Sequence, residues 1–178
     1  MKLTAEQLQE NWVKFTGYIN EYISSPRKEK LLEFYSKFED RLVLMPASHK
    51  KEYHNAFPGG YIEHVNRVVE CALKQYDLWE SEGCDMSTFT KEELVFSAMN
   101  HDLGKMGDEE NESYIPQTDQ WRKEKLGEDY KFNDKLDIGI VLMNPKIQLS
   151  TKKVFKNLVI NQGRGKLSSD NPPGSPGS

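Results

Sequence analysis

The apolar residues of this chain recur at steps of three and four positions, and this period constrains the fold more than any other feature of the sequence. Such a period gives a helix one apolar face. In the first segment it follows Thr4 and Gln7, whose spacing is that of a capping box, and comprises Leu8, Trp12, Phe15, Ile19 and Ile23. The same period predicts helices over about 26–45, 61–82, 90–102 and 150–160. We therefore expect an all-α bundle of about five helices.

The length and composition of the chain narrow the class of protein. With 178 residues, 37% of them hydrophobic, it can bury one core and is expected to form one domain. Its net charge of -4 argues against nonspecific wrapping of nucleic acid. The chain has two cysteines and no CxxC pair, which favours a reducing cytoplasmic setting. It has no apolar stretch long enough for a leader or a membrane span, so we expect a soluble protein without a membrane partner.

Three segments make up the expected domain. Residues 1–45 form an amino-terminal helical pair, residues 46–161 the rest of the helical core, and residues 162–178, rich in Gly, Ser and Pro, a disordered tail. Within the core, residues 46–60 form a polar loop, and residues 106–133 form mostly loop with a helical turn or two near 121–126. The run "LDIGIVLMN" at 136–144 fits either a strand or a buried helical turn.

Side chains that can bind metals or phosphate lie close together in the sequence where the helix over 90–102 ends. His101 and Asp102 are adjacent there, and Lys105 follows. These residue types are typical of an ordinary helix end, where they terminate the helix or complement its dipole. The alternative is a metal site beside a basic phosphate contact, in which His64 of the preceding helix supplies another ligand. Imidazole and carboxylate together suit Mn²⁺, Fe²⁺, Zn²⁺, Co²⁺ or Ni²⁺ better than Mg²⁺.

Two motifs at a defined spacing carry a resemblance to a known family. They are "YHNAFPGGYIEHVNRV" at 53–68 and "HDLGK" at 101–105. Together they resemble the HD-domain superfamily of metal-dependent phosphohydrolases, and "YIPQTDQWRKEKLGEDYKFND" at 114–134 is similar to small HD proteins of bacteriophages. The resemblance implies an HD-type core over 46–161, in which His64, His101 and Asp102 ligate a divalent metal ion.

The resemblance also implies a reaction. A bound cation acidifies water and polarises a phosphoryl oxygen, while a lysine neutralises the charge that develops. We therefore expect a metal-dependent phosphohydrolase or phosphodiesterase that acts on a nucleotide or a short nucleic acid, with Asp102 catalytic through the metal and Lys105 at the substrate phosphate. His54 would contact the phosphate or protonate the leaving oxygen. Arg122, otherwise a surface charge, would help to steer the anion.

The carboxyl-terminal part departs from the family pattern. For the family's final aspartate ligand we prefer Asp137 over Asp134, because the apolar run begins beside it. Alternatively, the chain is a truncated or altered HD domain whose fourth ligand is water or comes from a partner subunit. No histidine follows His101, which disfavours a two-metal centre and, with it, a di-iron oxygenase that cleaves an organophosphonate. The second functional hypothesis is a catalytically weak HD remnant, a binding or regulatory module that can form a homodimer.

Overall fold

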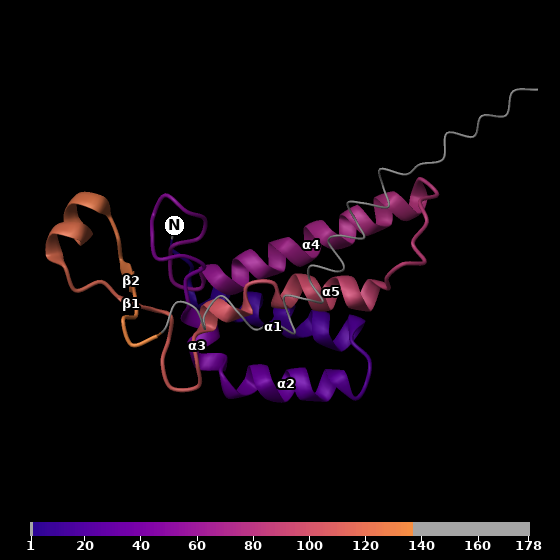
Figure 1. Ribbon diagram of the computed structural model, residues 1–178, viewed down its shortest axis with the longest axis horizontal. Coiled ribbons are helices and arrows are strands. Elements are labelled where there is room, and N and C mark those ends of the chain that lie inside the picture. Colours follow the sequence, from indigo (N-terminus) through magenta and orange to yellow (C-terminus); the bar gives the residue numbers. More distant parts are fainter. Residues whose placement is uncertain (1, 137–178) are drawn as a thin grey trace, which may run out of the picture.

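The computed structural model describes residues 2–136, and in this range the chain is built mainly from helices (Figure 1). The α-helices in this range are α1 (Ala5–Tyr22), α2 (Arg27–Lys37), α3 (Glu39–Leu44), α4 (Gly60–Ser81) and α5 (Lys91–Asn100). The predicted all-α class is confirmed. Four predicted features lie outside the described residues: Asp137, the rest of the apolar run to 144, the helix over 150–160 and the tail at 162–178.

Helix α1 lies between α2 and the pair formed by α4 and α5 (Figure 1). Its predicted capping box is present, because the Thr4 hydroxyl accepts the Gln7 N–H and the Gln7 side chain accepts the Thr4 N–H at 2.9 Å. The predicted apolar face is also confirmed and buries Trp12, Phe15, Tyr18 and Ile19. Because α1 contacts α2, α3, α4 and α5, its buried face forms part of the main hydrophobic core.

The second predicted helix is interrupted, so the expectation of one continuous helix there is wrong. Phe38 has backbone angles outside the helical region, with φ -114° and ψ 16°, and it separates α2 from α3. Its ring is nonetheless buried in the main core, and Leu42 beyond the break is fully buried. Because the apolar period continues through the break, the sequence pattern cannot reveal it.

Helices α4 and α5 run antiparallel and lie side by side along most of α5 (Figure 1). At one end of the pair, α4 begins where α5 ends. At the other end, Tyr76, Phe89 and Leu94 form a small hydrophobic cluster that is separate from the main core. The capping box predicted for α5 is present between Thr90 and Glu93. After α5 comes a short 3₁₀ helix, η1 (Leu103–Met106), whose Met106 is buried in the main core.

The segment at 106–133 is more ordered than the predicted loop. It contains an antiparallel pair of strands, β1 (Tyr114–Pro116) and β2 (Tyr130–Phe132), and the π-helical turn η2 (Arg122–Leu126) between them. Buried polar groups hold this hairpin together: the Gln117 side chain accepts two backbone N–H groups, and Glu128 pairs with Arg122 at 3.1 Å. The helical turn predicted near 121–126 is present as η2. Strands of three residues are too short to give a recognisable alternation, which is why the sequence does not predict β1 and β2.

Across residues 2–136, no helix combines the length and the apolar character that crossing a bilayer requires.

Candidate metal centre

The loop before α4 is folded back onto the first turns of that helix. Gly59 adopts a left-handed conformation with φ +80°, and a Cβ atom on Gly60 would collide with the carbonyl oxygen of Asn55. Asn55 itself is left-handed, with φ 54°, and its side-chain amide donates to the Gly60 carbonyl and to the Glu63 carboxylate. These contacts hold His54, the residue before Asn55, over the start of α4.

His101 is oriented by the carbonyl end of α5. Its Nδ1 lies 2.8 Å from the carbonyl oxygen of Ala98. A carbonyl oxygen only accepts hydrogen bonds, so Nδ1 carries the proton and donates it. In the neutral ring the lone pair is then on Nε2, which lies 3.2 Å from Nε2 of His64 on α4. Histidines that bind metals are commonly fixed by a hydrogen bond of this kind through the other ring nitrogen.

Three donor atoms from α4 and the end of α5 converge on one point. Besides the 3.2 Å between His64 Nε2 and His101 Nε2, Oδ2 of Asp102 lies 3.5 Å from the first nitrogen and 3.4 Å from the second. Three ligands of one ion with bonds of about 2.0–2.2 Å lie about 2.8–3.6 Å apart in tetrahedral or octahedral geometry. The three atoms therefore have the spacing of ligands that share one face of a first-row metal ion.

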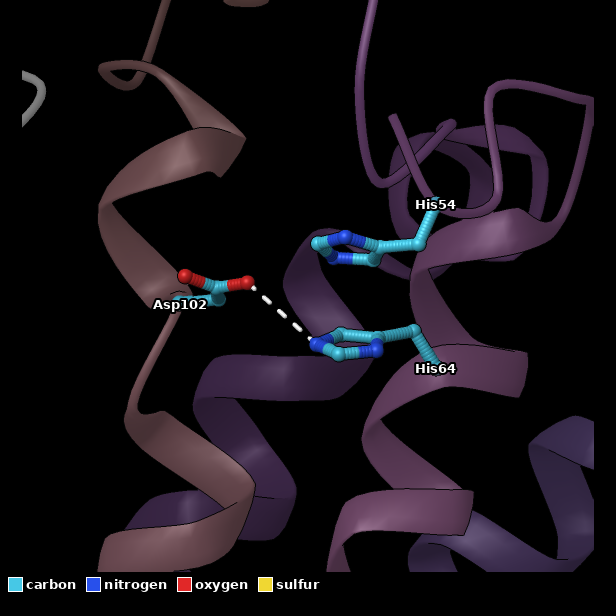
Figure 2. Close-up of side chains that lie close together, drawn as sticks. All are labelled: His54, His64 and Asp102. Atoms are coloured by element: carbon cyan, nitrogen blue, oxygen red, sulfur yellow. Dashed lines mark ion pairs between the residues drawn. The ribbon is translucent and has the colours of Figure 1, made fainter. Parts of the chain in front are cut away.

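His54 joins this group from the exposed loop. Figure 2 shows its ring lying over that of His64, with the Asp102 carboxylate facing both rings. The two ring centroids are 4.4 Å apart, and one ligand atom from each of His54, His64 and Asp102 lies within 4.8 Å of the others. We call His54, His64, His101 and Asp102 the donor cluster. Its nitrogen and carboxylate donors fit Mn²⁺, Fe²⁺, Zn²⁺, Co²⁺ and Ni²⁺.

Asp102 is the negative centre of this cluster. Burial by itself would raise its pKa, but hydrogen bonds from His101, His64 and Lys105 outweigh burial and hold the pKa of this carboxyl well below its usual range. For His101, burial would lower the pKa, and the hydrogen bond and charge of Asp102 reverse this to a net increase. For His54, burial lowers the pKa, and the neighbouring His64 and Lys105 lower it further, which favours a neutral ring.

The remaining predicted site residues lie at varying distances from the donor cluster. Lys105, expected at a substrate phosphate, lies on η1 with its Nζ 2.7 Å from Oδ2 of Asp102. Arg122 lies on η2 and pairs there with Glu128. This turn is at the tip of the hairpin, away from the junction of α4 and α5 (Figure 1). Asp134 is exposed in the turn after β2, and Asp137 lies outside the described residues.

Two tyrosines near the donor cluster were not expected from the sequence. Tyr114 of β1 stacks on His49 with ring centroids 5.7 Å apart, and burial, followed by the charge of Asp102, raises its pKa. Tyr61 is fully buried in the first turn of α4. The apolar face of α4 includes Tyr61 by position, but no sequence signal distinguishes it from an ordinary core aromatic.

Comparison of the chain with protein-family models, with curated proteins and with solved structures found no match. A functional conclusion therefore depends on the donor cluster itself.

Proposed function

We propose that this protein is a metal-dependent phosphohydrolase or phosphodiesterase of HD type, with a cation held by His64, His101 and Asp102. The observation that carries the proposal is the convergence of two imidazole nitrogens and one carboxylate oxygen to within 3.2–3.5 Å of one another. Lone pairs directed at one point repel unless a proton or a cation lies between them. A single divalent cation would satisfy all three atoms at once.

The residues around the cation would divide the work of hydrolysis. When bound, the ion supplies an activated water and polarises a phosphoryl oxygen. Lys105 stands beside the ligand Asp102 and would neutralise negative charge on the phosphate. His54, exposed at the edge of the donor cluster, would either ligate the ion or contact the leaving oxygen. The substrate class, a nucleotide or a short nucleic acid, is inferred from the resemblance to HD proteins.

Metal reconstitution tests the proposal directly. The chain, stripped with chelator and then supplied with Mn²⁺, is assayed on bis(p-nitrophenyl) phosphate, a diester, and on p-nitrophenyl phosphate, a monoester. We expect hydrolysis that depends on Mn²⁺ and is lost in Asp102→Ala. Asp77→Ala is the matched control, because it removes an exposed carboxylate about 20 Å further along α4. A wild-type chain that neither binds Mn²⁺ nor hydrolyses either ester would refute the proposal.

One observation favours the second candidate, a binding or regulatory module without catalysis. Lys105 already pairs with Asp102 at 2.7 Å, so the carboxylate has a positive partner without any cation. In that case the cluster would be a structural ion-pair network that joins α4 to η1. Failure to take up Mn²⁺, combined with marked destabilisation by Lys105→Met, would support this candidate over the enzyme.

A further inference from the structure

The hydroxyl of Tyr61 is a buried polar atom without a hydrogen-bond partner among residues 2–136. Tyr61 is fully buried in the main core. A buried donor without a partner costs about 1–3 kcal/mol, and phenylalanine would fill the same volume without that cost. Buried polar groups in folded proteins almost always have a partner, so the unpaired hydroxyl of Tyr61 indicates a partner that residues 2–136 do not provide.

A second buried tyrosine in the same core shows the usual arrangement. Tyr35 of α2 is also fully buried, but its hydroxyl donates to Oδ1 of Asn100 at 2.7 Å. Asn100 in turn donates from Nδ2 to the carbonyl oxygen of Phe96. The core therefore contains two phenols of equal burial, one with a defined protein partner and one without. This contrast makes Tyr35 a matched reference for Tyr61.

The position of Tyr61 connects it to the donor cluster. It lies three residues before His64 on α4, so both side chains leave the same face of the helix. Burial, then Tyr35 and then the charge of Asp102 raise the pKa of Tyr61, which agrees with a place on the core side of the cluster. The Asp102 carboxylate is already held by His64, His101 and Lys105 and does not accept from Tyr61.

We propose that Tyr61 is a positioning residue of the metal centre, whose buried hydroxyl hydrogen-bonds a solvent ligand of the cation from the core side. The inference rests on the proposed metal site and adds a residue to it. Three protein donors leave coordination positions for solvent on a four- or six-coordinate ion. A fixed hydrogen bond to such a ligand raises the affinity for the ion, and loss of an outer partner of this kind typically costs 10- to 100-fold in affinity.

The test compares Tyr61→Phe with Tyr35→Phe in two measurements, Mn²⁺ affinity by calorimetry and stability of the metal-free chain in urea. We expect Tyr61→Phe to bind Mn²⁺ about tenfold more weakly, with an unfolding midpoint at or above that of the wild type. Tyr35→Phe should show the reverse: unchanged Mn²⁺ affinity and a lower midpoint, because Asn100 loses its donor.

The possible outcomes separate this inference from the proposed function. Equal Mn²⁺ affinity in Tyr61→Phe and the wild type would overturn the role of Tyr61 and leave the metal site intact. A metal-free Tyr61→Phe that is destabilised as much as Tyr35→Phe would also overturn it, because its hydroxyl would then have a protein partner. A wild type that binds no Mn²⁺ would overturn both the proposed function and this inference.

Discussion

The two ends of the α4 and α5 pair are built from opposite kinds of residues. At one end, Tyr76 and Phe89 pack edge to face with ring centroids 5.8 Å apart, and Leu94 closes the cluster. At the other end, His64 and Asp102 belong to the donor cluster, where polar atoms converge. Both ends join the same two helices, so the difference between them is not required by the helix packing.

The difference indicates which end serves stability. Apolar burial stabilises a fold in proportion to the area removed from water, whereas a buried group of charges must first offset its own desolvation. A bundle selected only for stability would gain by repeating the aromatic cluster at both ends. Substitutions at the polar end should therefore affect function more than folding. The following predictions test this division between the two ends of the helix pair.

The largest effect on stability should come from the apolar end. Phe89 is 7% exposed, so Phe89→Ala removes most of a ring from the small cluster and should lower the free energy of unfolding by about 3 kcal/mol. Urea unfolding measures this loss, with Val13→Ala, at a 59% exposed position on α1, as a control that should change little. Weaker Mn²⁺ binding by the folded Phe89→Ala variant would break the division between the two ends.

The next effect should come from the polar end and should require metal. If Asp102 is a ligand, Asp102→Ala should lose the metal-linked stabilisation, about 2.7 kcal/mol when free Mn²⁺ is a hundredfold above its dissociation constant. Melting curves of the wild type and the variant, with and without Mn²⁺, measure it. A rise in melting temperature with Mn²⁺ that persists unchanged in Asp102→Ala would mean that His101 and Asp102 do not bind the ion, and the metal centre would have to be abandoned.

A smaller effect should distinguish the two roles left open for His54. If His54 is a ligand, His54→Ala should bind Mn²⁺ about tenfold more weakly than the wild type, a loss of about 1.4 kcal/mol in binding free energy. As a phosphate contact, its removal should slow hydrolysis and leave Mn²⁺ affinity unchanged. Calorimetry and the diester assay together separate the two roles. His49→Ala, on the same loop but stacked against Tyr114, should change neither Mn²⁺ affinity nor the hydrolysis rate.

The smallest effect should come from an ion pair at the apolar end. Asp77 and Lys91 pair at 2.8 Å on the surface. Exposed pairs of this kind are screened by solvent, so Asp77→Ala should lower the free energy of unfolding by well under about 1 kcal/mol. The loss should shrink further in 1 M NaCl, and a loss that persists there would mean that Asp77 acts through packing and not through charge.

The accuracy of the sequence predictions depended on the range of the interactions involved. The caps at Thr4 and Thr90 and the apolar faces of α1, α4 and α5 are determined within one or two helical turns, and all were predicted. The break at Phe38 and the short strands of the hairpin depend on contacts between distant segments, and both were missed. His64 and His101, which come from the two motifs, lie with their Nε2 atoms 3.2 Å apart, and their role as metal ligands stays a prediction.

The place of His54 in the site shows the same limit. Its approach to His64 is set by the left-handed Asn55 and by the close contact of Gly60 with the Asn55 carbonyl. The "GG" pair signals a tight turn in the sequence, but the direction in which that turn aims a neighbouring side chain is decided by tertiary packing. The sequence therefore identified His54 as a candidate without indicating that its ring would lie over that of His64.

The antiparallel arrangement of α4 and α5 also has a kinetic consequence. His64 and His101 are only 37 residues apart in the chain, and the helices that carry them are consecutive. Contacts within one helical hairpin close a short loop and form early, before distant segments have docked. The three donors could thus meet before α1 and α2 complete the core. We expect Mn²⁺ present during refolding to speed the formation of native structure, which stopped-flow fluorescence would detect.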